Sequence, residues 1–190
     1  IEDLAEAGVC SFKIEGRLKN ASYVQNVTRA YDMILNDLVA KYPDRYRRAS
    51  FGTVKASFVP DVNKTFNRGY TELFLDGKKG RWSSMDAPKS MGEEIGVVRS
   101  ISRNKADGTM EVQLKTKPGI TLRNGDGLCF STRDGVTGFR ADVCRGDSVL
   151  SKDITSLKEK TTLYRNISSE FEKTLNSSNC DRTLRINIKL

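Results

Sequence analysis

The spacing of apolar residues changes along this chain of 190 residues, and that change constrains the fold more than any single motif. Between residues 24 and 38, apolar side chains recur every three or four positions, which predicts an amphipathic helix. From Ile95 onward the period is two, and short apolar runs are separated by turn sequences such as Asp107-Gly108. Short strands joined by such turns are typical of a small antiparallel β-barrel. The expected fold class is therefore α+β.

A charged cluster ends a predicted short strand over Val9–Ile14, immediately before the helix. Successive side chains of a strand point to opposite faces, so Phe12 and Ile14 share one face. Lys13 and Glu15 then share the other face. A Lys and a Glu at the carboxyl end of a strand occupy the position at which an α/β barrel carries active-site groups. From the residues alone, the alternative is a solvated strand end with a surface ion pair.

The predicted strand and helix form one unit of a parallel α/β architecture, and one unit cannot close a barrel because its strand leaves both edges unpaired. We therefore expect Val9–Ile14 to pair with the second domain, a symmetry mate or a swapped partner. Farther along the chain we expect one strand over Gly138–Cys144 and a half-buried strand over Thr183–Leu190. The predicted segments are a terminal strand–helix unit at 1–47, a connector with short strands at 48–92, a small β-barrel at 93–166, and a short helix with a C-terminal strand at 167–190.

Composition narrows the chemistry that the chain can carry. The sequence contains no His, which excludes Ser-His and Cys-His nucleophile pairs from this segment. Its four cysteines are far apart and form no Cys-x-x-Cys pair, so we expect neither a disulfide framework nor a metal site. No apolar run reaches the roughly 18 residues of a membrane-spanning helix, and we expect a cytoplasmic protein. The formal net charge of +8 suits nucleic acid, an acidic protein surface or an anionic substrate.

Residues 41–48, with the sequence KYPDRYRR, interleave aromatic and basic side chains. A solvated domain boundary is the structural explanation of such a segment. The functional interpretation is a patch that follows phosphate groups, with Tyr42 and Tyr46 as stacking surfaces for bases. The candidate residues for binding RNA or another anion are Arg45, Arg47, Arg48, Arg68, Lys78 and Lys79.

Several ordered blocks of the sequence resemble one known family. The run GVCSFKIEGRLKNASYVQNVTRAY at residues 8–31 is similar to a segment of the collagenase-like peptidase family U-32 that reads SxKIEGRxKxxxYVxxVTxxY. Because the blocks are spread over nearly the whole chain, the resemblance is more specific than one short motif. It continues in FNRGY at 66–70, PKSMG at 88–92, NGDGLCF at 124–130 and LYRN at 163–166.

The resemblance implies a fold and a set of roles. The strand–helix unit would be a late remnant of a (β/α)8 barrel, while the family's cysteine-containing signature would lie upstream of this chain. The strand pattern after Ile95 is similar to the second-domain barrel of translation elongation factors. Lys13, Glu15 and Arg17 would line the mouth of the full barrel as catalytic candidates. There, Lys13 and Arg17 would hold an anionic substrate, and Glu15 would orient Lys13 or accept a proton.

The resemblance leaves the function open between three hypotheses. The first is a C-terminal fragment of a collagenase-like U-32 peptidase, serving as an accessory or substrate-binding barrel that is inactive alone. The alternative is the RNA-binding module of an iron–sulfur, prephenate-dependent RNA base hydroxylase of the same family. In both, this segment holds no cofactor, any iron–sulfur cluster belongs to the parent protein, and the partners are the upstream barrel and structured RNA. The third is a structural role, in which the chain shields the catalytic domain or forms a homodimer through residues 1–20.

Overall fold

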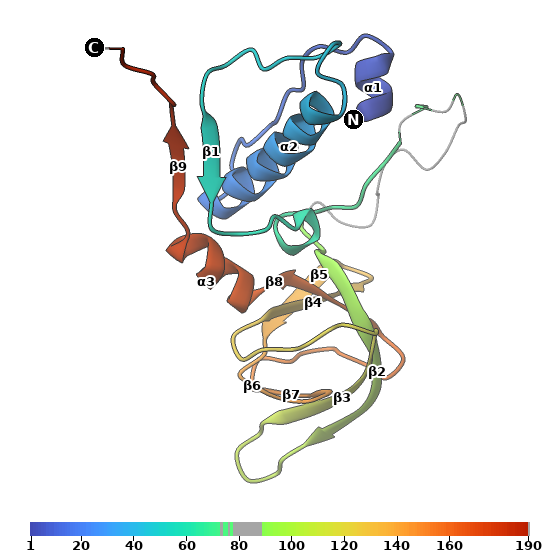
Figure 1. Ribbon diagram of the computed structural model, residues 1–190. Helices are drawn as coiled ribbons and strands as arrows, with labels where there is room; N and C mark the ends of the chain where they lie inside the picture. Colours follow the sequence, from blue (N-terminus) through green and yellow to red (C-terminus); the bar gives the residue numbers. More distant parts are fainter. Residues whose placement is uncertain (73, 76, 78–88, 190) are drawn as a thin grey trace. The chain divides into compact units, whose positions relative to one another are not determined.

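The computed structural model describes residues 1–72, 74–75, 77 and 89–189 (Figure 1). These residues form two compact units. The helical unit comprises Ile1–Val62 and Thr174–Leu190, and the sheet unit comprises Asn63–Lys173. Among the described residues, none of the helices combines the length and the apolar character needed to cross a membrane.

The helical unit contains two helices and a two-stranded antiparallel ribbon. The ribbon pairs two segments from opposite ends of the sequence, with Thr53 opposite Thr183 and Ala56 opposite Cys180. Both strands are short and the second is exposed along its whole length. The elements are α1 (Glu2–Glu6), α2 (Ala21–Lys41), β1 (Thr53–Ala56) and β9 (Cys180–Thr183).

Local capping signals set the helix ends. The Asn20 side chain accepts a hydrogen bond from the Tyr23 amide at 3.0 Å and so caps the start of α2. The helix stops at Tyr42, directly before Pro43. α1 ends in a Schellman motif, since Gly8 has φ +94° and the Val9 amide donates to the Leu4 carbonyl at 2.9 Å.

The predicted strand over Val9–Ile14 is wrong. This segment has no regular secondary structure and pairs with no described residue. A strand needs a neighbouring backbone to complete its hydrogen-bond ladder, and here none is in place. Of the expected strand–helix unit, only the helix α2 is present, and a (β/α)8-barrel remnant is therefore not shown. The predicted alternation of faces is nevertheless seen, because Phe12 and Ile14 are half-buried while Lys13 and Glu15 are exposed.

The predicted half-buried strand over Thr183–Leu190 is also wrong. Regular structure ends at Thr183, and the side chains of Leu184, Ile186 and Ile188 are 62%, 75% and 77% exposed. Apolar alternation requires a second layer to cover one face, and no described part of the helical unit covers these side chains.

Seven antiparallel strands form the sheet unit, together with α3 (Ser169–Ser177) and a short 3-10 helix, η1 (Val62–Lys64), which both cross the boundary between the units. The strand order is β5-β4-β8-β2-β3-β7-β6. β8 lies in the middle of the sheet and pairs with β2 and β4. The strands are β2 (Glu93–Arg103), β3 (Met110–Thr116), β4 (Gly127–Thr132), β5 (Gly135–Arg140), β6 (Val143–Arg145), β7 (Ser148–Ser151) and β8 (Thr162–Ile167).

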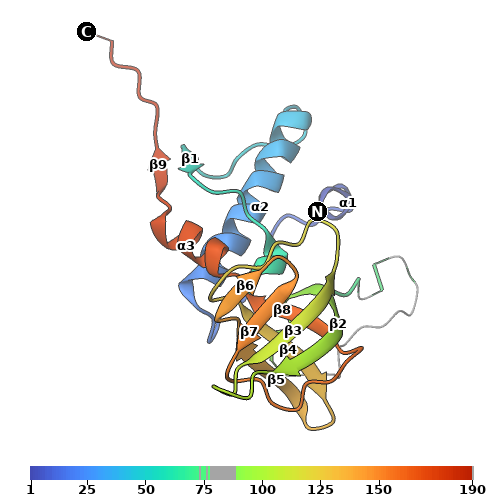
Figure 2. The ribbon, with the colours of Figure 1, turned by 90° about the horizontal axis from the view of Figure 1, so that it is seen from below.

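The sheet is curled rather than flat (Figure 2). β5 and β6 stand at opposite ends of the strand order, yet only Ala141 and Asp142 separate them in sequence. The predicted continuous strand over Gly138–Cys144 is therefore broken at these two residues. The first half pairs with β4 and the second half with β7, so one bent segment joins the two edges.

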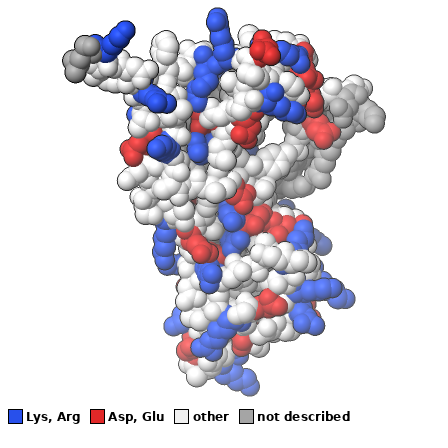
Figure 3. Space-filling view, in the orientation of Figure 1, with Lys and Arg blue, Asp and Glu red and all other residues white. Residues whose placement is uncertain are grey.

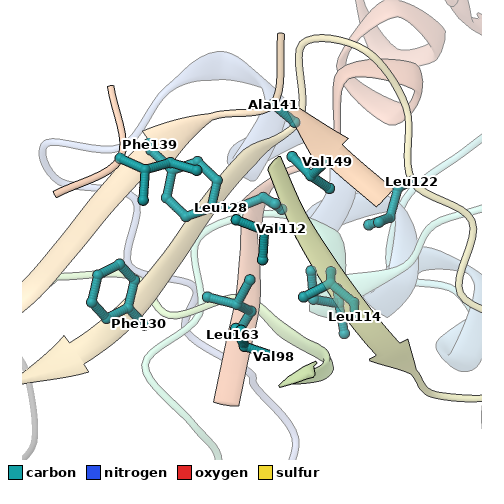
Figure 4. Packing of buried hydrophobic residues seen from close by; sticks show 12 residues of the cluster. Val98, Val112, Leu114, Leu122, Leu128, Phe130, Phe139, Ala141, Val149 and Leu163 are labelled. Atoms are coloured by element: carbon teal, nitrogen blue, oxygen red, sulfur yellow. The ribbon is translucent and has the colours of Figure 1, made fainter. Parts of the chain in front are cut away.

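Apolar side chains fill the inside of the curled sheet (Figure 4). Val112, Leu128, Val149 and Leu163 have no exposed surface and come from four different strands. Burying each such side chain stabilises the fold by about 1.5–3 kcal/mol. The core explains the period of two, because alternate residues of each strand point inward.

Candidate nucleic-acid interface

The predicted barrel-mouth residues lie on the exposed side of the segment before α2. The Lys13 ammonium and the Glu15 carboxylate form an ion pair at 2.6 Å, with 84% and 69% of the side chains exposed. On the opposite side, the Phe12 ring contacts the Tyr31 ring of α2, with 6.0 Å between centroids. The structure thus brings Lys13 and Glu15 together, whereas Arg17 is exposed and forms no ion pair with described residues.

Aromatic and acidic groups hold the first arginine of the basic linker, residues 41–48. The Arg45 guanidinium lies 5.5 Å from the Tyr42 ring centroid and 5.4 Å from that of Tyr46. The same guanidinium pairs with the Glu6 carboxylate of α1 at 3.4 Å. Cation–π contacts of this kind stabilise by about 0.5–1 kcal/mol at exposed sites. The Tyr42 and Tyr46 rings therefore each contact the Arg45 guanidinium within the linker itself.

α1 presents a second carboxylate to the linker. Glu2 accepts hydrogen bonds at 2.7 Å from both the Lys41 ammonium and the Tyr42 hydroxyl. These bonds lower the pKa of Glu2 below its ordinary value of 4.5, with Lys41 the larger cause. The bond to Glu2 is also the main cause that raises the pKa of Lys41 above its ordinary value of 10.5. α1 thus neutralises part of the linker's positive charge.

We expect this attachment of α1 to be insensitive to pH from about 5 to about 10, given the directions of the two pKa shifts. Glu2 has a lowered pKa, so its contribution is complete above its unfolded value and is lost as the pH falls through the folded one. Lys41 has a raised pKa, so its contribution is lost only as the pH rises through its folded value. NMR titration of the Glu2 side-chain carbon would follow the contact. Detachment near pH 6 would contradict the assignment.

The last arginine of the linker belongs to a half-buried charge cluster on α2. The Asp32 carboxylate lies 2.6 Å from Arg29 and 3.9 Å from Arg48. Arg48 also donates to the Asn36 side chain. Two guanidinium groups share one carboxylate, and the buried Nε of Arg29 has no hydrogen-bond partner. The cluster therefore keeps one uncompensated positive charge.

An open cavity of about 810 Å³ lies within the helical unit, beside this cluster. Its lining includes Arg45, Arg47 and Arg48 from the linker and Asp32 from α2. Arg47 is exposed and forms no ion pair with the part of the chain that the structure describes. Three of the predicted anion-binding arginines therefore line one cavity, although the sequence alone shows them only as neighbours.

The other predicted anion-binding residues are placed elsewhere or lie outside the described residues. Arg68 belongs to the sheet unit, where its exposed guanidinium lies 5.5 Å from the Phe66 ring centroid. Lys78 and Lys79 lie outside the described residues. On the face shown in Figure 3, basic and acidic side chains are interspersed rather than segregated.

A buried polar network organises the sheet unit, and reasoning from the sequence missed it. Arg165 is 6% exposed and donates to the Glu93 carboxylate at 2.6 and 2.8 Å. It also donates to the Thr121 carbonyl at 2.8 Å and to the Asp126 carboxylate at 3.1 Å. Burial would lower the pKa of Arg165, but its bonds to Glu93 and Asp126 outweigh burial and raise it.

Asp126 connects this network to the start of α3. The carboxylate is fully buried and accepts hydrogen bonds from the Ser169 amide at 2.9 Å, the Ser169 hydroxyl at 3.0 Å and the Arg123 amide at 3.0 Å. The hydroxyl of Ser168 accepts a hydrogen bond from the Phe171 amide at 3.4 Å and so caps the start of α3. The available sequence signal was the position of Asp126 and Arg165 in two of the resembling blocks.

Two further blocks join through Asn67. The buried Asn67 carbonyl accepts hydrogen bonds from the Met91 amide at 2.9 Å and the Ser90 hydroxyl at 3.1 Å. The Ser90 hydroxyl oxygen in turn accepts from the Asn67 amide at 3.0 Å. Met91 also accepts from the Cys129 thiol on β4 at 3.4 Å. Asn67 therefore links its block to Ser90 and Met91, and Met91 links both to β4.

The thiols of this chain do not fit an iron–sulfur cluster. Within the described ranges, no group of three or more Cys, Asp or Glu side chains is placed to hold a metal ion. Burial raises the pKa of Cys129 and of Cys144 to about 11, so both thiols stay protonated at neutral pH and are poor metal ligands. We therefore assign no chemical step to a cluster held by these residues.

Comparison with protein families decides what the first part of the chain is. The model of Peptidase family U32 matches residues 1–84. Residues 1–84, the U32 segment, are similar to that family. The U32 segment contains the Lys13–Glu15 pair, the basic linker and every residue that lines the cavity. The resemblance drawn from the blocks at 8–31 and 66–70 is thereby confirmed.

A curated relative extends the similarity beyond the U32 segment. Over 196 residues the chain is 33% identical to the 23S rRNA 5-hydroxycytidine C2501 synthase of Escherichia coli (strain K12). The alignment covers 98% of this chain and 29% of that enzyme, so the chain spans less than a third of its relative's length. No solved structure matches the chain. The likeness to the elongation-factor barrel stays a prediction.

Proposed function

We propose that this chain is the RNA-holding part of an RNA base hydroxylase that acts on a cytidine of ribosomal RNA. The observation that carries the proposal is the 33% identity, across 98% of the chain, to an enzyme named for making 5-hydroxycytidine in 23S rRNA. The three arginines around one cavity support it, because RNA binding depends on neutralising phosphate groups. An RNA substrate also fits the expected cytoplasmic location.

We further propose that Lys13, Glu15 and Arg17 face the reacting part of the RNA in the full-length protein. The Lys13 ammonium and the Glu15 carboxylate lie 2.6 Å apart, and both side chains are exposed. Lys13 and Arg17 supply positive charge for a phosphate or another anion. Glu15 fixes the Lys13 ammonium and is the base candidate of the three.

Changing Glu15 to Gln in the full-length protein should reduce hydroxycytidine formation by about 100-fold or more, because a general base contributes on that order. Folding should be unaffected, since the side chain is 69% exposed and pairs only with Lys13. The measurement is mass spectrometry of ribosomal RNA nucleosides from cells that lack the protein and are complemented with each variant. Glu159→Gln is the matched control, because Glu159 is likewise exposed. Full complementation by Glu15→Gln would remove Glu15 from the site.

The peptidase interpretation is the second candidate, and the description of the matching family favours it. It predicts that the full-length protein cleaves gelatin and that Glu15→Gln leaves RNA nucleosides unchanged. Nucleoside analysis and a gelatin assay on the same preparation separate the two functions. We expect the cytidine to be unmodified in cells that lack the protein, and we expect the full-length protein not to cleave gelatin. Normal hydroxycytidine in those cells would overturn the proposal.

A further inference from the structure

We propose that the cavity of the helical unit binds a single nucleotide of the RNA, with its phosphate on Arg47 and Arg48 and its base against the aromatic and aliphatic wall. This inference rests on the proposed function and adds a binding site to it. It is carried by the charge, the lining and the size of the cavity, each of which belongs to one compact unit.

The charge around the cavity favours an anion. Arg45 is paired with Glu6, so its charge is balanced. Arg47 has no ion pair among the described residues, and Arg48 shares the single Asp32 carboxylate with Arg29. Two positive charges are thus uncompensated, which is the charge that a phosphate group neutralises by charge-assisted hydrogen bonds. The half-buried position of Arg48 strengthens that interaction relative to an open surface.

The apolar part of the lining favours a flat, weakly polar group. Three aromatic rings line the cavity, those of Phe12, Tyr31 and Tyr46. Stacking of a base on an aromatic ring contributes about 1–3 kcal/mol in single-stranded RNA recognition. Aliphatic side chains complete the wall, namely Val9, Ile14, Leu35, Leu38 and Val39.

The size of the cavity matches one nucleotide. Its volume of about 810 Å³ lies in the range of small-molecule sites, roughly 300–1,000 Å³. A double helix is far too wide to enter it, so the bound nucleotide must come from a single-stranded loop or be turned out of its helix. An enzyme that reacts with a base requires the same exposure of its target.

Binding of cytidine 5′-monophosphate to the chain, followed by NMR, tests the inference. The nucleotide should shift amide signals of residues 8–14, 28–39 and 45–50. Cytidine and inorganic phosphate are the two comparison ligands. Each should bind at least about tenfold more weakly than the nucleotide, because each makes only half of the contacts. Equal affinity for inorganic phosphate would overturn the role of the wall, and shifts confined to other residues would overturn the site.

Two variants test the cavity by independent properties. Arg47→Ala removes an uncompensated charge and should weaken nucleotide binding about tenfold. Arg185→Ala is its control, because Arg185 is exposed and does not line the cavity. Thr28→Trp fills the cavity from α2 without changing charge and should abolish the shifts. Gln25→Trp is its control, one turn away on the same helix and outside the lining.

The same variants with a ribosomal RNA fragment distinguish failure of the cavity from failure of the proposed function. Weaker RNA binding by Arg47→Ala and Thr28→Trp, with both controls unchanged, supports the inference. RNA binding that is tight and equal in all four variants overturns the cavity and leaves the proposed function in place. Absence of RNA binding by the unmodified chain overturns both.

Discussion

Replacing Arg165 with Met should lower the free energy of unfolding of the sheet unit by about 3–5 kcal/mol. Arg165 is 6% exposed and satisfies two buried carboxylates and one carbonyl. Met fills a similar volume but donates no hydrogen bonds. The fully buried Asp126 and the nearly buried Glu93 would then lose their cationic partner. A buried carboxylate without a partner destabilises the folded state strongly, because its lost hydration is no longer compensated.

Hydrogen exchange of core amides such as that of Val112 would measure this loss within the sheet unit. Arg123→Met is the control, because Arg123 pairs with Glu170 at 3.3 Å on the surface, with 54% and 65% of the two side chains exposed. An exposed pair of this kind contributes at most about 1 kcal/mol. If both variants lose the same small amount, the network is not what holds the sheet unit together.

Gly92→Ala is expected to be the second large effect, at about 3 kcal/mol or more. Gly92 has φ +72°, and an added Cβ would lie 2.0 Å from the backbone carbonyl oxygen of Arg165. Backbone cannot move aside as a flexible side chain does, so the β2–β8 pairing would have to shift. Alanine at position 92 would therefore be destabilising for two reasons: its positive φ is strained for a residue with a side chain, and its Cβ collides with backbone.

Gly146→Ala separates strain from collision. Gly146 has φ +57° in the turn before β7, and its added Cβ would meet nothing within 4 Å. Strain alone should cost about 1–2 kcal/mol there. Hydrogen exchange in the sheet unit would compare the two variants. If both variants lose the same free energy of unfolding, the backbone at residues 92 and 165 moves apart without destabilising the sheet unit, and the predicted collision is contradicted.

Local signals in the sequence predicted local structure well. The turn at Gly108 was predicted from the conformation that one or two residues prefer, and the Asn20 cap and the Gly8 helix end depend on preferences of the same kind. The antiparallel sheet followed from the period of two, since alternate side chains fill one core. These features depend on neighbours in sequence or on a repeating pattern.

Features that depend on distant partners were not predictable in the same way. An alternating sequence predicts a strand at Val9–Ile14 and at Thr183–Leu190, but a ladder and a covering layer must come from elsewhere in the molecule. The network around Arg165 joins residues up to 72 positions apart, and no periodicity indicates such pairs. The resemblance of the sequence blocks to a known family includes the positions of Asp126 and Arg165, but it does not indicate their role.

The sequence predicted which residues belong to the candidate site, but it did not predict how they are arranged. The sequence identified Arg45, Arg47 and Arg48 as anion-binding candidates, and the structure places all three around one cavity. The sequence did not indicate that Glu2 and Glu6 neutralise part of the positive charge of the linker, because α1 is 39 residues away in sequence. Charge balance in a site is a property of the fold rather than of a segment.

Equilibrium binding of the chain to a ribosomal RNA fragment across a series of salt concentrations tests the central claim most directly. The account predicts that the logarithm of the binding constant falls linearly with the logarithm of salt, by about 0.7 for each single-stranded phosphate neutralised. Arg47→Ala should reduce that slope by about one such step, whereas Arg185→Ala should leave it unchanged. Absence of RNA binding at about 50 mM salt would contradict the claim that this chain holds RNA.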